Sequence, residues 1–142
     1  MRVFSPHMAI AVNLRLPSFS ALINALLSAQ IMGEYDALSG LSQVGGATER
    51  EELTVGGTGH GCGHNLLNVA CLAAAVGMKA EMEEKKLPGT VVFYGCPAEE
   101  VLTGKVFMAR EGAFTDLDAC FAWHGDSVNR VMTGKHTGLN SA

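Results

Sequence analysis

The spacing of apolar and polar residues changes several times along the chain, and each change predicts a different element. Residues 65–87 are apolar on nearly all sides as far as Met78 and charged after it. This pattern predicts a buried helix whose last turns reach solvent, with Asn65 as its cap and Pro88 as its stop. The β-branched and aromatic run 90–94 lies between two glycines and predicts a buried strand.

The alternation of strand and helix continues in the second half of the chain. Residues 104–111 have helical spacing, and Gly112 is well placed to end that helix. Residues 117–123 predict a second buried strand, which His124 follows. A strand, a helix and another strand in this order indicate a parallel sheet. We therefore expect an α/β fold with a mostly parallel sheet flanked by helices.

Residues 1–30 differ in texture from the rest and carry no motif to which chemistry can be attached. Within them begins an apolar run, residues 18–32, which imitates the apolar stretch of a signal peptide with a cut near Ala29. The late position of the run and Pro17 just before it favour a different interpretation. We expect an amphipathic or buried helix over about residues 20–29.

Glycines are dense from Gly33 to Gly63, where periodicity is weak, and this predicts a long functional loop. The loop ends in Gly59-His60-Gly61-Cys62-Gly63-His64-Asn65. Metal ligands must converge on a point about 2.0–2.3 Å away, and glycines let the backbone aim Cys62 and His64 at one point. The alternatives are a phosphate-cradling or flexible turn with both histidines on the surface, and a nucleophilic Cys62–His64 dyad.

Side chains that could complete a metal site follow the predicted strands. They are Asp36, if residues 30–33 also form a strand, Glu99 and Glu100 after the first strand, and His124 after the second. The carboxyl ends of strands in an open α/β sheet form the usual ligand crevice. Taken singly, a glutamate pair is more often solvated surface, and a lone histidine is more often a satisfied core or surface residue. Their joint placement favours a shared site.

Composition narrows the class of protein. The chain has 142 residues, of which 48% are hydrophobic and 17% charged, so we expect one globular domain. Ten basic and fourteen acidic residues give a net charge of −4, which leaves no basic stripe for nucleic acid. No apolar run reaches the roughly 20 residues of a membrane helix. The mean hydropathy of +0.21 is nonetheless high and indicates uncovered apolar surface.

Four cysteines are too few in a chain of this length for a secreted disulfide scaffold. We expect them to be reduced and the protein to be cytoplasmic. Cys71, Cys96 and Cys120 lie in or beside predicted core elements and are interpreted as small buried apolar residues.

Four motifs together resemble the M20 family of metallopeptidases and amidohydrolases, most closely its p-aminobenzoyl-glutamate hydrolase type. They are Gly33-Glu34-Tyr35-Asp36-Ala37-Leu38, the glycine-rich segment from Gly59 to Asn65, Phe93-Tyr94-Gly95-Cys96-Pro97-Ala98-Glu99-Glu100, and Trp123-His124. The resemblance implies a partial zinc-peptidase-like, or phosphorylase/hydrolase-like, catalytic domain over residues 31–142, with residues 1–30 unmatched. It also implies that the dimerisation domain and the final histidine ligand of the family are absent from this chain.

The resemblance further implies a site with two divalent ions, manganese or zinc. The implied metal ligands are Cys62, His64, Glu100 and His124. Glu99 would be the general base and Asp36 a supporting catalytic residue. The implied reaction is hydrolysis of the amide bond of an N-acyl amino acid or dipeptide, such as p-aminobenzoyl-glutamate.

The expected partners are a small amide or dipeptide substrate and a second copy or second chain that completes the site; no nucleic acid or membrane partner is expected. The alternative hypothesis is a truncated, catalytically inactive M20 relative. Its excess apolarity would then come from a core surface that lacks its partner strands.

Overall fold

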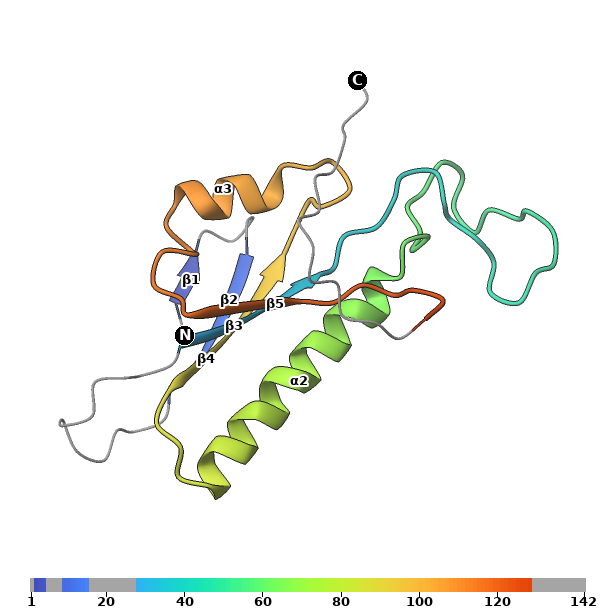
Figure 1. The fold of residues 1–142 in the computed structure, drawn as a ribbon. Coiled ribbons are helices and arrows are strands. Elements are labelled where there is room, and N and C mark those ends of the chain that lie inside the picture. Colours follow the sequence, from blue (N-terminus) through green and yellow to red (C-terminus); the bar gives the residue numbers. More distant parts are fainter. Residues whose placement is uncertain (1, 5–8, 16–27, 129–142) are drawn as a thin grey trace.

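The computed structural model describes residues 2–4, 9–15 and 28–128, which form a five-stranded sheet and two helices (Figure 1). The strand order is β1-β2-β4-β3-β5. The strands are β1 (Arg2–Phe4), β2 (Ala9–Arg15), β3 (Ser28–Glu34), β4 (Thr90–Cys96) and β5 (Ala119–Ala122). The helices are α2 (His64–Glu84) and α3 (Gly104–Arg110).

The part of the sheet that carries the motifs is parallel. β3 pairs in parallel with β4 on one side and with β5 on the other, while β2 pairs with β4 and β1 with β2 in antiparallel fashion. The α/β prediction with a mostly parallel sheet and flanking helices is confirmed. Residues 9–15, which belong to the unmatched N-terminal segment, are hydrogen-bonded into this same sheet.

The helix expected over residues 20–29 is wrong at its C-terminal end, because Ser28 and Ala29 begin β3. Ala29 is only 2% exposed and pairs with Val91 on one side and Ala119 on the other. Pairing on both sides of an inner strand outweighs local helical spacing. The rest of that expected helix lies outside the described residues.

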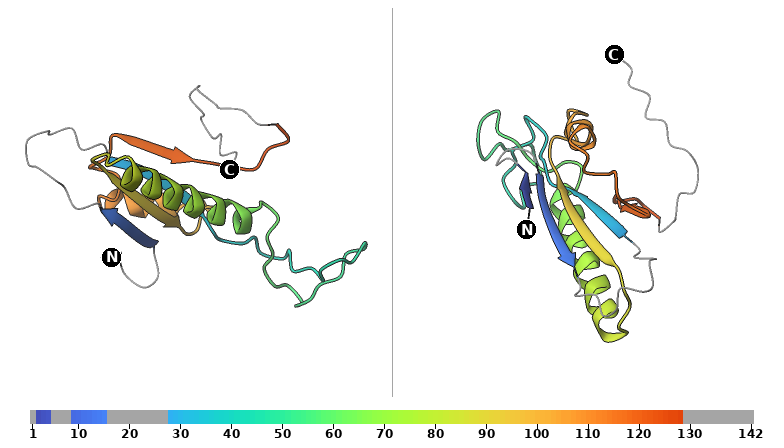
Figure 2. Two further views of the ribbon diagram at one scale, coloured as in Figure 1. Left: turned by 90° about the horizontal axis from the view of Figure 1, so that it is seen from below. Right: turned by 90° about the vertical axis from the view of Figure 1, so that its left-hand side faces the viewer.

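The two helices cover opposite faces of the sheet, as the views in Figure 2 show. Side chains alternate along β4, so that Val91 and Phe93 face α2 while Val92 and Tyr94 face α3. The α2 cluster consists of Ile31, Leu67, Cys71, Ala75, Val91 and Phe93. The α3 cluster consists of Val92, Tyr94, Cys96 and Met108. The strand expected at residues 90–94 is thus confirmed as buried.

Helix α2 is less buried than its sequence predicts. Its buried residues are His64, Leu67, Cys71 and Ala75, which lie on one face. The apolar side chains of the other face point to solvent, with exposed fractions of 69% for Leu66, 64% for Val69 and 55% for Val76. The prediction of a helix buried on nearly all sides is therefore wrong, because only the sheet covers α2 among the described residues.

The N-cap of α2 also differs from the expected one. Gly63 is the N-cap residue with a φ of 83°, and its carbonyl accepts the N–H groups of Leu66 and Leu67. Asn65 lies inside the first turn instead. A left-handed N-cap conformation costs little at glycine, which explains why the helix begins one residue earlier than expected.

Strand β5 is an exposed strand at the sheet edge, which corrects the expectation of a second buried strand. Phe121 is 53% exposed and Trp123 is 51% exposed, and Cys120 is exposed rather than buried. β5 pairs with β3 on one side only among the described strands. Between β5 and α2 runs an apolar groove of about 390 Å³, lined by Ile31, Ala70, Cys71, Ala74, Met78, Phe121, Ala122 and Trp123.

Other details follow the sequence more closely. Helix α3 is followed by Gly112 with a φ of 80°, whose N–H donates to the carbonyl of Ala109 as expected of a C-terminal glycine. All four cysteines are free, and Cys71 and Cys96 are buried. No helix in the described part of the chain is long and apolar enough to cross a membrane.

Leu67→Ala should lower the free energy of unfolding by about 2–5 kcal/mol, because Leu67 is 1% exposed and fills the space between α2 and the sheet. Its neighbour Leu66 is the matched control, since the same truncation on the exposed face should cost less than about 0.5 kcal/mol. Chemical denaturation followed by circular dichroism measures both values. Equal losses would contradict the packing of α2 described above.

Candidate metal centre

The polar residues singled out in the sequence converge where the parallel strands end. β3 ends at Glu34 and β4 at Cys96, and these two residues are paired in the register. β5 ends at Ala122, two residues before His124, and α2 starts at His64. The crevice at the carboxyl ends of the strands is thus closed on one side by the first turn of a helix.

His64 is the centre of this arrangement and is 0% exposed. Its Nδ1 lies 3.0 Å from the backbone carbonyl oxygen of Asp36 and 3.4 Å from Oδ1 of the same residue. A carbonyl oxygen can only accept, so Nδ1 carries the ring hydrogen and donates it there. The surface-histidine alternative is therefore wrong for His64.

Three glutamates approach the same imidazole. Glu34 Oε2 lies 3.2 Å from His64 Nε2, Glu99 Oε2 lies 3.8 Å from Nε2, and Glu100 Oε1 lies 3.8 Å from Nδ1. The alternative that the pair Glu99 and Glu100 is simply solvated surface does not describe them, because both are only partly exposed and face the buried ring. So many carboxylates around one imidazole create a strongly negative crevice.

Asp36 ties the first loop to the segment after β4. Its Oδ2 accepts the backbone N–H of Glu100 at 3.0 Å. Burial by itself would raise the pKa of Asp36, but hydrogen bonds from the backbone of Glu100 and Glu99 and the nearby His64 bring it below the usual value. The side chain therefore stays ionised and adds to the negative charge.

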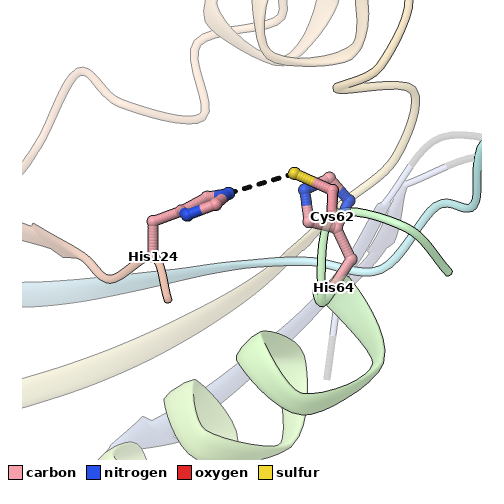
Figure 3. A group of neighbouring side chains, drawn as sticks. All are labelled: Cys62, His64 and His124. Atoms are coloured by element: carbon pink, nitrogen blue, oxygen red, sulfur yellow. Dashed lines mark hydrogen bonds between the residues drawn. The ribbon is translucent and has the colours of Figure 1, made fainter. Parts of the chain in front are cut away.

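Cys62 and His124 complete the cluster on its more open side (Figure 3). The Sγ atom of Cys62 lies 3.1 Å from His124 Nε2, while His124 Nδ1 lies 2.9 Å from the carbonyl oxygen of Gly125. Ligand atoms of Cys62, His64 and His124 lie within 4.8 Å of one another. Burial, and then the charges of Glu100 and Glu99, raise the pKa of the Cys62 thiol.

The donor set fits a bound divalent cation. Three buried polar atoms have no hydrogen-bond partner: His64 Nε2, Asp36 Oδ1 and Glu100 Oε1. Buried acceptors without donors are costly, and a cation would satisfy them. A thiol, imidazoles and carboxylates are also the ligand types of zinc, and imidazole and carboxylate suit manganese.

The structure thus brings together all six site residues that the sequence singles out, while their roles stay predictions. It adds Glu34, which lies in a quoted motif but received no role; its place at the end of a strand is the signal that could have identified it. His60 is exposed and lies away from this cluster. It lines a separate pocket of about 360 Å³ with Gly40, Leu41, Ser42, Gln43, Arg50 and Gly61.

Comparison with known proteins shows several related sequences. A p-aminobenzoyl-glutamate hydrolase chain of Escherichia coli is 53% identical over 97 residues, which are 68% of this chain and 20% of that protein. The Xaa-Arg dipeptidase of Mus musculus is 33% identical over 129 residues, covering 87% of this chain and 26% of the relative. An IAA-amino acid hydrolase of Arabidopsis thaliana is 42% identical over 84 residues, covering 58% and 18%.

The matches cover most of this chain and only a small part of each relative. The chain spans about a fifth to a quarter of the length of these curated proteins. No protein-family model matches it.

Gly59→Ala should lower the free energy of unfolding by about 1–3 kcal/mol, because the added Cβ would overlap the carbonyl oxygen of Leu41 in the loop that carries Cys62. Gly45→Ala in the same loop is the control and should change it by less than about 0.5 kcal/mol, since nothing lies within 4 Å of the added atom. Denaturant titration of both variants tests this, and unchanged stability of Gly59→Ala would contradict the close approach.

Proposed function

Because this chain belongs to the M20 family of metallopeptidases and amidohydrolases, we propose that it is the metal-binding part of an amidohydrolase that cleaves an N-acyl amino acid or dipeptide. The observation that carries the proposal is the fully buried His64, whose unpartnered Nε2 faces carboxylates beside the pair Cys62 and His124. Such a set of donors suits a cation better than it suits a folded core.

In this proposal Cys62, His64, Glu100 and His124 hold a divalent ion, zinc or manganese. An ion bound there supplies Lewis-acid polarisation of the substrate carbonyl and lowers the pKa of a water molecule. The residues whose donor atoms lie within reach of one another form two groups that share His64, namely Cys62, His64 and His124, and Glu34, His64 and Glu99. Two overlapping groups are compatible with the two ions that the family resemblance implies.

Glu99 is the proposed general base. Its side chain is 30% exposed, more than that of Glu34 or Glu100, so it borders the open side of the crevice where substrate and water enter. It takes a proton from the attacking water and returns it to the leaving amide nitrogen. Asp36 supports the site by holding the Glu100 backbone and by accepting the Nδ1 hydrogen of His64 through its carbonyl oxygen.

The names of the relatives suggest the substrate class. One relative is a p-aminobenzoyl-glutamate hydrolase, one an Xaa-Arg dipeptidase and one an IAA-amino acid hydrolase, and we interpret all three substrates as small amides. We extend this class to the present chain and take p-aminobenzoyl-glutamate as the first compound to test. The name of the first relative describes it as one of the subunits of its enzyme, which supports a second chain or copy as partner. A cytoplasmic location remains our prediction.

A second candidate is a chain that binds the metal and does not turn over substrate by itself. The exposed apolar face of α2 and the exposed residues Phe121 and Trp123 favour it, because monomeric proteins rarely leave contiguous apolar surface uncovered. Metal content and turnover of the purified chain distinguish the two candidates. Bound zinc or manganese without hydrolysis supports the second, and a chain that binds neither ion contradicts both.

Glu99→Gln should reduce hydrolysis of p-aminobenzoyl-glutamate by about 10²–10⁴-fold, because the amide cannot accept the proton of water. Bound metal, measured by elemental analysis after dialysis, should stay at the level of the unsubstituted chain. Glu84→Gln on the exposed end of α2 is the control and should leave both values unchanged. An active Glu99→Gln variant would show that the base is another residue.

His124→Ala should weaken zinc binding at least about tenfold, because a ligand contributes no less than the outer groups whose loss costs 10–100-fold. The exposed His60, outside the cluster, provides the matched control as His60→Ala. Competition with a chromophoric chelator measures both affinities. Equal affinity in the two variants would remove His124 from the ligand set.

A further inference from the structure

We propose that Glu34 is a further ligand of the ion that His64 binds, and that Lys105 holds the Glu34 carboxylate in position. This inference rests on the metal site proposed above and deepens it. Glu34 has no assigned role in the resemblance, and it is identified here by its contacts with His64 and Lys105.

The first step of the argument is the orientation of the His64 ring. Its Nδ1 hydrogen is donated to the carbonyl oxygen of Asp36, so in the neutral ring Nε2 carries a lone pair. This lone pair belongs to a nitrogen that is fully buried and has no hydrogen-bond partner. A metal ion is the ligand that an oriented neutral imidazole of this kind binds.

The second step is the distance from this nitrogen to Glu34. Oε2 of Glu34 lies 3.2 Å from Nε2 without forming a hydrogen bond. Two acceptor atoms at this distance repel each other unless a positive charge lies between them. Ligand atoms about 2.0–2.2 Å from a tetrahedral zinc ion are separated by roughly 3.3 Å, so the observed spacing is that of two ligands on one ion.

The third step is the support that Glu34 receives. It is the last residue of β3 and is paired with Cys96 of β4, so its backbone is fixed by the sheet. Its other oxygen, Oε1, is bound by the ammonium group of Lys105 from α3. Lys105 thus occupies one oxygen, leaves Oε2 toward His64, and offsets part of the negative charge of the crevice.

The test measures binding of Zn²⁺ and Co²⁺ to the 142-residue chain by calorimetry. Glu34→Gln should weaken Zn²⁺ binding by at least about 10–100-fold, the loss seen when even an outer partner is removed. Lys105→Met, which keeps the apolar stem, should produce a smaller loss of the same sign. Glu81→Gln on the exposed face of α2 is the matched control and should bind as the unsubstituted chain does.

The absorption spectrum of the Co²⁺ form gives a second readout that does not depend on activity. If Glu34 is a ligand, the ligand-field bands change in Glu34→Gln and stay unchanged in Glu81→Gln. Unchanged bands and unchanged affinity in Glu34→Gln would overturn the proposal while leaving the proposed function intact.

Two further outcomes keep the inference separable from the proposed function. If the unsubstituted chain binds neither ion, both are overturned. If circular dichroism shows that Glu34→Gln does not fold, Lys105→Met decides: a folded variant with weakened Zn²⁺ binding supports the proposal, and one with unchanged binding overturns it.

Discussion

The candidate site depends on the burial of one imidazole between a helix start and the ends of three strands. His64 is the first residue of α2 and one of its four buried residues, so the packing of the helix on β3 and β4 fixes where the ring lies. The hydrogen bond from Nδ1 to Asp36 then fixes how the ring is turned. Every other group in the crevice is defined by its distance from this ring.

Charge is the main cost of this arrangement. Glu34, Asp36, Glu99 and Glu100 all lie near a ring that is completely removed from solvent. Lys105 is the ammonium group that reaches one of these carboxylates among the described residues. The positive end of the α2 dipole adds only about half an elementary charge. The remaining negative charge contributes to the raised pKa of Cys62 and would make the crevice attractive to a cation.

Sequence patterns predict the elements well where local composition and tertiary environment agree. The β-branched run of β4 is buried on both faces, and its strand is correct at both ends within two residues. Patterns fail where burial depends on what covers an element. The apolar residues of α2 and β5 predict complete burial, yet Leu66 and Phe121 are exposed because no described segment packs on them. Periodicity cannot reveal such missing cover.

The site residues are predictable for a related reason. Parallel strands end at one edge, so Asp36, Glu99 and His124 meet there once the strands are recognised. Glu34 needs coordinates, because the same glutamate could face either side of its strand, and only the contacts with His64 and Lys105 distinguish the two sides.

The uncovered edge of β5 has a consequence for handling the protein. Its outer backbone N–H and C=O groups have no strand partner in the described part of the sheet, and they lie beside exposed aromatic rings. Such an edge is a template on which a strand of another molecule can add itself. Intermolecular sheet growth in concentrated solution is therefore the main route by which samples of this chain would precipitate.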